Sequence, residues 1–231
     1  PKGAPRLDGA TLIVGSERIP LRSGALHYWR LRTEHWRPAL RALKELGLPM
    51  VETYVPWGVH ELPGRGPSYD YDFGQTDPRK NLGAFLELVA EEGMHCFLRP
   101  GPHINSELTY FGLPERVVAD PDICARTPRG NPVVLFFPPR MFPVPSHAAD
   151  AYHEAVASWF KRVAEEITPH LYPHGPVVLL QVDNEVGYFF RNGPFCRDYH
   201  EDALVRWIEH LERTHGSLEA TRAAHEADYT T

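Results

Sequence analysis

The sequence predicts an α/β fold built on a parallel sheet, because strand-like and helix-like segments alternate four times along the chain. Polar and aromatic residues follow each predicted strand, and in a parallel sheet such positions meet at one edge. A doubly wound sheet and a (β/α)8 barrel both fit the alternation. Neither GxGxxG nor GxxxxGKS/T follows a strand, so the convergent polar residues favour the barrel. The polar clusters lie at residues 27–29, 54–61, 99–107 and 184–185.

The first segments are a β-hairpin, a strand and a helix. Turn signals flank two apolar runs within residues 7–22, which predicts the hairpin. Residues 23–28 are the first strand of the repeat. Thr33 is the expected N-cap of the first helix, which Gly47 terminates. The apolar positions of this helix are Trp36, Leu40, Leu43 and Leu46.

The second and third strands are predicted at residues 50–56 and 95–99, with a helix over residues 81–92 between them. Gly93 follows this helix directly and suits its carboxyl end. The apolar face of the helix contains Leu82, Phe85, Leu86 and Val89.

The remaining segments are a long loop, two helices and a fourth strand. A Pro- and Gly-rich loop is expected from about residue 101 to 146, followed by a helix over residues 148–171 and a strand over residues 177–182. A fourth helix over residues 198–214 and a polar helical piece to Tyr229 complete the prediction. The third helix is expected to bury Tyr152, Val156, Phe160, Val163 and Ile167.

Composition indicates a soluble globular chain, since 42% of its 231 residues are hydrophobic and 23% are charged. The net charge is −6 and the basic residues are scattered, so we expect no nucleic-acid partner. No apolar run is long enough to cross a bilayer and no signal peptide is seen, which favours no membrane partner and a cytoplasmic location. The chain begins at Pro1 without Met, which is compatible with removal of an upstream segment.

The sequence predicts neither a metal nor a cofactor. Three cysteines (Cys96, Cys124 and Cys196) form no CxxC pair, which argues against a disulfide framework and a zinc site. The thirteen histidines form no HxH or HxxxH pair on a convincing face.

The strongest functional signal follows the fourth strand. Residues 177–182 are almost all apolar, which predicts a strand buried on both faces. Asp183, Asn184 and Glu185 come directly after it, where α/β barrels build their active sites. Considered alone, these residues are also compatible with an acid that caps a helix or pairs with an arginine.

Seven blocks of sequence, in order over roughly residues 7–190, resemble glycoside hydrolase family 35, the retaining β-galactosidases. The tail that begins at Thr214 is more similar to the related family 42 β-galactosidases. The seven blocks are SGALHY (23–28), VETYVPW (51–57), HE (60–61), YDF (71–73), LRPGP (98–102), GLP (112–114) and QVDNE (181–185).

The resemblance implies a (β/α)8 TIM barrel of clan A. Residues 1–231 would be the amino-terminal part of one catalytic domain, a hairpin followed by roughly the first four βα units, with the rest of the barrel missing. The implied activity is hydrolysis of terminal β-galactosides with retention, and Glu185 matches the acid/base. The positions that match sugar-contacting residues are Tyr54, Asn105, Ser106, Glu107 and Asn184.

The second carboxyl of the retaining mechanism is expected outside this sequence. Retention requires two carboxyl groups about 5–5.5 Å apart. The resemblance implies that the nucleophile follows strand seven, so we expect it beyond residue 231 and expect the isolated chain to be inactive. Glu107, near the end of the third strand, is the internal alternative.

The sequence also predicts roles for Trp57, for the pair of Glu52 and Arg99, and for Tyr188. Trp57 is expected either to stack on a sugar or to seal the core. Glu52 is expected to pair with Arg99 rather than to catalyse. Tyr188 is a candidate for lining the leaving-group side.

The chain departs from the family pattern at Gly58, where Asn is common, and at His103, where Tyr is common; residues 108–112 differ as well. These departures affect the prediction of which sugar is bound more than the prediction of the reaction type. A clan A glycosidase for another sugar, such as a β-glucosidase or a mannosidase, is therefore the first alternative. A non-catalytic carbohydrate-binding barrel is the second, and Asn184 with Glu185 argue against it. A homo-oligomer is compatible with the sequence.

Overall fold

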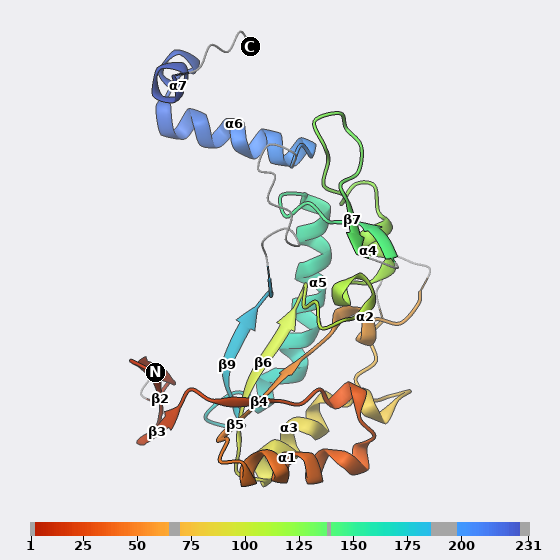
Figure 1. The fold of residues 1–231 in the computed structure, drawn as a ribbon, viewed down its shortest axis with the longest axis vertical. Helices are drawn as coiled ribbons and strands as arrows, with labels where there is room; N and C mark the ends of the chain where they lie inside the picture. Colours follow the sequence, from red (N-terminus) through yellow and green to blue (C-terminus); the bar gives the residue numbers. More distant parts are fainter. Residues whose placement is uncertain (1–2, 65–69, 138–139, 186–197, 227–231) are drawn as a thin grey trace. The chain divides into compact units, whose positions relative to one another are not determined.

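The protein folds into two compact units (Figure 1). The computed structural model describes residues 3–64, 70–137, 140–185 and 198–226. The first unit is Pro1–Pro114 with Ala157–Gly187, and the second is Glu115–Val156 with Tyr188–Thr231. The candidate catalytic and sugar-contacting residues, from Tyr54 to Glu185, belong to the first unit, which also contains the parallel sheet.

The sheet of the first unit has the strand order β4-β5-β6-β9, so strands that follow one another in the repeat are neighbours in the sheet. All three strand pairs are parallel. This arrangement confirms the predicted α/β fold with a parallel sheet. The strands are β4 (Ser23–Ala25), β5 (Met50–Tyr54), β6 (His95–Gly101) and β9 (Val177–Val182).

The first strand is shorter than predicted. β4 ends at Ala25, and the 3-10 helix η1 (Tyr28–Arg30) occupies part of the segment expected to extend the strand. The indole N–H of Trp36 donates to the carbonyl of Tyr28 at 3.0 Å, and the hydroxyl of Tyr28 bonds the ring of His60 at 2.7 Å. These tertiary contacts hold the chain in a turn that its strand-like composition did not predict.

Helices α1 (Trp36–Glu45) and α3 (Leu82–Glu91) connect the strands as predicted. Asn81 caps α3, because its side-chain oxygen accepts a backbone N–H of the first turn at 2.8 Å. The predicted cap of α1 is wrong. Thr33 lies within a 3-10 helix (Thr33–His35) that leads directly into α1, and no side chain caps that end.

The long helix α5 (Asp150–Ile167) buries three of the five positions predicted for its core face, and it buries Trp159 in addition. Trp159 is fully buried, whereas Val156 and Phe160 are only partly buried. The ring of Trp159 stacks on that of Trp57, with centroids 6.0 Å apart and planes 7° apart. Trp57 is also fully buried, so it seals the core and does not face a sugar. The positions buried as predicted are Tyr152, Val163 and Ile167.

The predicted amino-terminal hairpin belongs to a three-stranded antiparallel sheet. A third strand adds to the hairpin because a two-residue turn at Gly9 and Ala10 forms a second hairpin before it. Apolar side chains of this sheet pack against Met50 and Val178, near the amino-terminal ends of β5 and β9. The strands are β1 (Arg6–Asp8), β2 (Thr11–Val14) and β3 (Glu17–Pro20).

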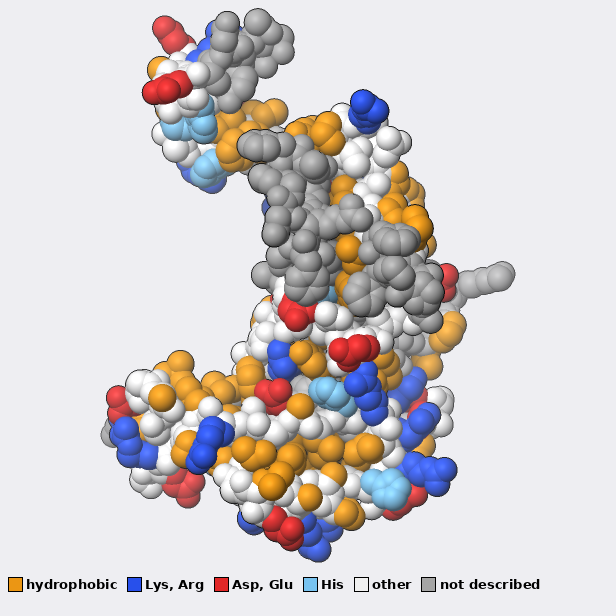
Figure 2. All heavy atoms as spheres, viewed as in Figure 1, with side chains coloured by type: hydrophobic (Ala, Val, Ile, Leu, Met, Phe, Trp, Pro, Cys, Tyr) orange, Lys and Arg blue, Asp and Glu red, His pale blue; other side chains and the backbone are white. Residues whose placement is uncertain are grey.

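Strand β9 is only partly buried. Val177 and Val178 are buried, but Leu180 is 49% exposed and Val182 is 65% exposed. The prediction of burial on both faces is therefore wrong for the second half of the strand. β9 is an edge strand, and the described part of the chain does not cover these side chains. Figure 2 shows other hydrophobic side chains gathered around the lower ends of the parallel strands.

The segment predicted as one long loop contains helices and a hairpin. Prolines obscured the alternation of buried residues there, which include Val133, Leu135, Phe142 and Val144. The elements are η4 (Thr109–Gly112), α4 (Glu115–Ala119), β7 (Val134–Phe137) and β8 (Arg140–Pro143).

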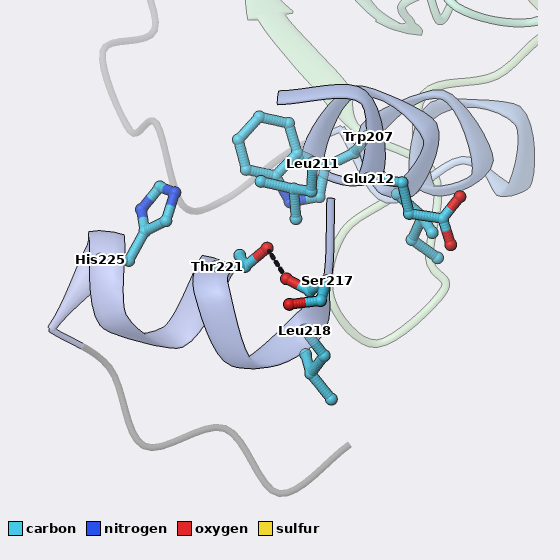
Figure 3. A pocket seen from close by; sticks show the side chains of 8 residues that line it. Trp207, Leu211, Glu212, Ser217, Leu218, Thr221 and His225 are labelled. Carbon is cyan, nitrogen blue, oxygen red and sulfur yellow. Dashed lines mark hydrogen bonds between the residues drawn. The ribbon is translucent and has the colours of Figure 1, made fainter. Parts of the chain in front are cut away.

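The two carboxyl-terminal helices, α6 (Glu201–His215) and α7 (Leu218–His225), agree with the predicted fourth helix and polar helical piece, whose predicted end at Tyr229 lies outside the described residues. They line a mainly apolar pocket of about 430 Å³ (Figure 3). Trp207 and Leu218 contribute to its walls, and none of the candidate site residues does. None of the described helices is long and apolar enough to span a bilayer.

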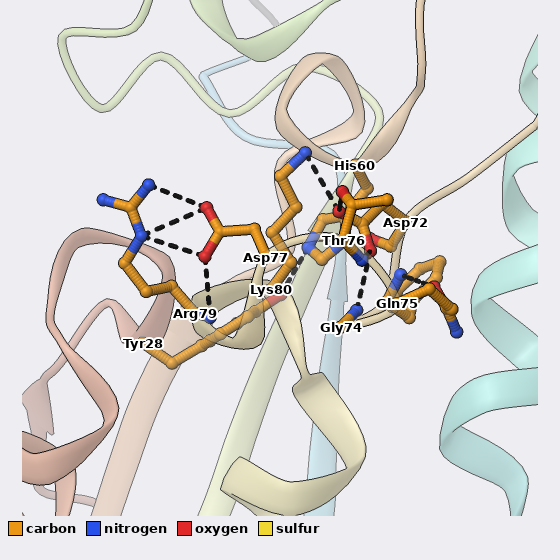
Figure 4. A network of polar contacts seen from close by, with 10 residues as sticks. Tyr28, His60, Asp72, Gly74, Gln75, Thr76, Asp77, Arg79 and Lys80 are labelled. Carbon is orange, nitrogen blue, oxygen red and sulfur yellow. Dashed lines mark hydrogen bonds and ion pairs between the residues drawn. The ribbon is translucent and has the colours of Figure 1, made fainter.

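A buried polar network links η1 to the loop that precedes α3 (Figure 4). One ring nitrogen of His60 lies 2.7 Å from the carbonyl of Asp72, which can only accept, so this Nδ1 carries the proton. The other, Nε2, then accepts from the hydroxyl of Tyr28. Burial is the main cause that lowers the pKa of His60 to about 4, so the ring is neutral at pH 7.

Replacing Asp72 by asparagine is expected to lower the free energy of unfolding by about 2–3 kcal/mol at pH 7. The buried carboxylate accepts the N–H of Gly74 at 2.9 Å and that of Thr76 at 3.1 Å, and it lies 3.6 Å from Nζ of Lys80. Burial alone would raise the pKa of Asp72. The hydroxyl of Thr76 also donates to this carboxylate, and together with the N–H groups and Lys80 it outweighs burial and holds the pKa well below its usual range.

Because the folded pKa of Asp72 is lowered, its stabilisation is present above about pH 4 and is lost as the pH falls further. Urea unfolding of both proteins at pH 7 and pH 3 measures the effect. The difference between them should shrink at pH 3, and an equal difference at both pH values would show that the charge of Asp72 is not the cause.

Candidate active site

Two loops meet at the carboxyl edge of the sheet. One follows β6 and carries Asn105, and the other follows β9 and carries Glu185. The amide Nδ2 of Asn105 donates to Oε2 of Glu185 at 2.5 Å, across eighty residues of sequence. Glu185 is otherwise exposed, so its carboxyl group is open to solvent and is held from one side. The structure therefore brings two of the predicted site residues into direct contact.

Asn184 is the buried anchor of the second loop, with an exposed fraction of 9%. Its Oδ1 accepts from Nη2 of Arg99 at 2.7 Å and from Nε2 of Gln181 at 3.2 Å. Its Nδ2 donates to the carbonyl of Ile104 at 3.1 Å. Arginine can only donate and a carbonyl can only accept, so the orientation of the amide is determined by its partners.

Asp183 and His103 lock the two loops together. Oδ1 of Asp183 accepts the N–H of His103 at 3.3 Å and that of Asn184 at 3.0 Å. Nδ1 of His103 donates to the carbonyl of Asn184 at 2.6 Å. His103 is therefore a bracing residue between the loops, a role that its departure from the family pattern did not reveal in the sequence.

The backbone of both loops adopts an uncommon conformation. Asn105, Ser106 and Glu107 have φ values of 59°, 50° and 53°, and Asp183 and Glu185 have φ values of 62° and 52°. The left-handed region is disfavoured for residues with a Cβ, and such residues concentrate at functional sites. This conformation therefore marks both loops as candidates for function independently of sequence resemblance.

Tyr54, at the end of β5, lies in the same electrostatic environment. Its pKa is raised, mainly by burial and also by the carboxylates of Glu52, Glu185 and Glu107, against the opposing effect of Arg99. The phenol is therefore protonated at neutral pH and can donate to a ligand. The guanidinium carbon of Arg99 lies 4.2 Å from the centroid of the Tyr54 ring.

The expected pairing of Glu52 with Arg99 is present, with Nη1 of Arg99 3.5 Å from Oε1 of Glu52. The hydroxyl of Ser23 also donates to Glu52 at 3.0 Å. Arg99 thus joins Glu52 on β5 to Asn184 after β9. It is a central residue of the site, although the sequence predicted for it only the role of a partner to Glu52.

The other predicted site residues make none of these contacts between the two loops. Glu107 has an exposed side chain, and the backbone carbonyl of Ser106 accepts a hydrogen bond from Arg30. Tyr188 is outside the described residues. Among the residues that the structure describes, no group of three or more His, Cys, Asp or Glu side chains could hold a metal ion.

Gly58, where the resemblance leads one to expect Asn, has a structural explanation. A Cβ at this position would lie 2.9 Å from the backbone carbonyl oxygen of Leu113. Gly58→Ala is therefore expected to lower the free energy of unfolding by about 1–3 kcal/mol, because backbone cannot move aside cheaply. Gly64→Ala is the control, since its nearest contact would be 3.9 Å away. Equal stability of the two variants in chemical denaturation would refute the explanation.

Comparison with known sequences gives a family match and partial-length relatives. Residues 11–131, more than half of the chain, match the family model "Glycosyl hydrolases family 35". An exo-beta-D-glucosaminidase of Thermococcus kodakarensis is 33% identical over 98% of this chain and 29% of its own length. The beta-galactosidase-1-like protein 3 of Homo sapiens is 34% identical over 81% of this chain and 25% of its own length. The chain thus spans less than a third of these relatives.

Comparison with solved structures supports the fold. A beta-galactosidase of the haloarchaeon Halorubrum lacusprofundi has a TM-score of 0.61 and 24% identity over 88% of this chain and 26% of that chain. A beta-galactosidase of the psychrophilic Marinomonas ef1 has a TM-score of 0.63 and 18% identity over 87% of this chain and 26% of that chain. At this level of identity the likeness concerns the fold alone.

Proposed function

Because the chain belongs to glycosyl hydrolase family 35, we propose that the polypeptide containing it is a retaining glycoside hydrolase that removes terminal β-galactose. Residues 1–231 are proposed to be the amino-terminal part of one (β/α)8 barrel, contributing four of its strands. The edge position of β9 and the exposure of Leu180 and Val182 support this, since a neighbouring strand and helix would cover them.

The observation that carries the proposal is the contact between Asn105 and Glu185 at the carboxyl edge of the sheet. In barrel enzymes this edge holds the active site. Glu185 is proposed to be the acid/base. Its exposed carboxyl group could exchange a proton with solvent and donate it to a bound substrate. Tyr54, Ser106 and Glu107 are proposed to contact sugar hydroxyls around it.

In the proposed reaction, Glu185 protonates the glycosidic oxygen while a second carboxylate attacks the anomeric carbon. The aglycone leaves, and a glycosyl–enzyme ester forms. Glu185 then removes a proton from water, which attacks the same carbon and releases the sugar with its configuration retained. The second carboxylate is proposed to come from a later strand of the barrel, with Glu107 as the internal alternative.

The hydrogen bonds of Asn184 favour a substrate with a hydroxyl group on the carbon next to the anomeric carbon. Arg99 and Gln181 occupy both acceptor positions of its amide oxygen, and one of its two N–H groups donates to Ile104. The remaining N–H can only donate, so it suits a hydroxyl oxygen and not an ammonium group. This favours a galactoside over the glucosaminide named for the Thermococcus relative.

The test is a panel of aryl β-glycosides assayed with the complete polypeptide: galactoside, glucoside, mannoside and glucosaminide. The galactoside is expected to have a kcat/KM at least about tenfold above the others, as hydroxyl-directed sites discriminate strongly. A higher value for another sugar would replace the proposed substrate. Galactose binding without any turnover would favour a carbohydrate-binding barrel. Residues 1–231 alone are expected to hydrolyse none of the panel.

A further inference from the structure

Five side chains form a continuous stack beside the candidate site. The ring of His27 stacks on that of Trp29 (centroids 5.5 Å apart, planes at 15°) and contacts that of Tyr54 at a tilt (5.2 Å, 37°). The guanidinium carbon of Arg30 lies 4.5 Å from the Trp29 centroid, and that of Arg99 lies 4.2 Å from the Tyr54 centroid. The indole N–H of Trp29 also donates to the carbonyl of Tyr54 at 3.2 Å. Each end of the stack is thus a cation over an aromatic face, with His27 in the middle.

His27 is an uncharged spacer in this stack. Burial is the main cause that lowers its pKa to about 4, and Arg30 and Arg99 lower it further against the opposing effect of Glu52. Its Nδ1 is buried and has no hydrogen-bond partner among the residues that the structure describes. A proton on this ring would add a third cation between two guanidinium groups. The ring therefore contributes shape and contact area rather than charge.

The two ends of the stack hold separate parts of the candidate site. Arg30 donates to the backbone carbonyl of Ser106, in the loop after β6. Arg99 donates to the side chain of Asn184, after β9, at 2.7 Å. Tyr54 is itself a member of the stack. Three residues that we propose to contact the sugar are therefore connected through one column of rings.

We propose that His27 is a positioning residue for glycoside hydrolysis: its ring sets the position of Tyr54 and, through the stack, that of the sugar-contacting loop. The inference rests on the proposed function. A displacement of about 1 Å in a contact made in the transition state can reduce the rate by about 10²-fold. Loss of the ring should therefore reduce catalysis more than substrate affinity.

The experiment compares three variants of the complete polypeptide on an aryl β-galactoside. His27→Ala is expected to lower kcat/KM about 30-fold, mostly through kcat, because Tyr54 loses one of its supporting faces. His27→Phe keeps a neutral aromatic ring and is expected to retain activity within about threefold of the wild type. His35→Ala, which removes an exposed histidine in the neighbouring 3-10 helix, is the control and should match the wild type.

A double-mutant cycle with Tyr54→Phe separates positioning from a general loss of structure. If His27 acts through Tyr54, removing the phenolic hydroxyl should have a smaller effect in the His27→Ala background than in the wild type. Thermal unfolding of each variant reports folding separately. Coupling of the two losses, with rescue by phenylalanine, supports the proposal.

Three results would overturn the proposal. The first is additive losses for the His27 and Tyr54 substitutions, and the second is a wild-type kcat/KM in His27→Ala. The third is a His27→Phe variant as inactive as His27→Ala although both variants are folded. If the wild-type polypeptide hydrolyses no glycoside, the proposed function fails, and the positioning role fails with it. Because wild-type turnover is measured first, the two failures can be distinguished.

Discussion

Replacing Glu185 by alanine is expected to lower kcat by about 10³-fold on galactosides with poor leaving groups, such as alkyl galactosides. These substrates need a proton on the departing oxygen, and Glu185 is the proposed donor. Activated aryl galactosides need no such proton, so their first step should be largely spared. Steady-state and pre-steady-state kinetics on both substrate types measure the difference.

Azide provides a second readout for the same variant. With no base to activate water, the glycosyl–enzyme should persist, and azide should accelerate its breakdown to a β-galactosyl azide. Glu45→Ala, which removes an exposed acid from α1, is the control and should behave as the wild type. Equal loss on both substrate types, with no effect of azide, would show that Glu185 is not the acid/base.

Replacing Asn184 by alanine is expected to lower kcat/KM about 100-fold and the free energy of unfolding by about 1–3 kcal/mol. The rate effect is expected from the second N–H of the amide, which has no partner among the described residues and whose proposed hydrogen bond to the substrate would strengthen as charge develops on the sugar ring. The stability effect follows from the buried donors of Arg99 and Gln181, which lose their shared acceptor. Enzyme kinetics and urea denaturation report the two effects separately.

A 2-deoxygalactoside tests the contact directly. It lacks the hydroxyl that Asn184 is proposed to bind, so the variant and the wild type should differ much less on it than on the parent galactoside. Gln181→Ala is a matched control, because it removes one support of Asn184 but leaves the donor in place. A full 100-fold loss on the deoxy substrate would make the role of Asn184 structural only.

The sequence by itself determined the strands of the parallel sheet, the main helices and the family. Apolar runs and 3.6-residue patterns are local, so the strand at residues 177–182 and the helix at residues 81–92 were predicted within a residue of β9 and α3. The order of the βα units followed from chain connectivity. The acidic motif after β9 is equally local, because Asn184 and Glu185 directly follow an apolar run, and the sequence alone therefore singles them out.

Tertiary structure decided what depends on residues far apart in the chain. Trp57 had two possible roles until Trp159, about a hundred positions later, was found to stack on it. The contact between Asn105 and Glu185 joins two loops eighty residues apart, and the ring contact of His27 with Tyr54 joins the segment after β4 to the end of β5. No local pattern encodes such contacts, because they depend on how the strands pair and how the loops turn after them. The residue types of the candidate site were therefore readable in sequence, whereas the geometry that brings them together required the fold.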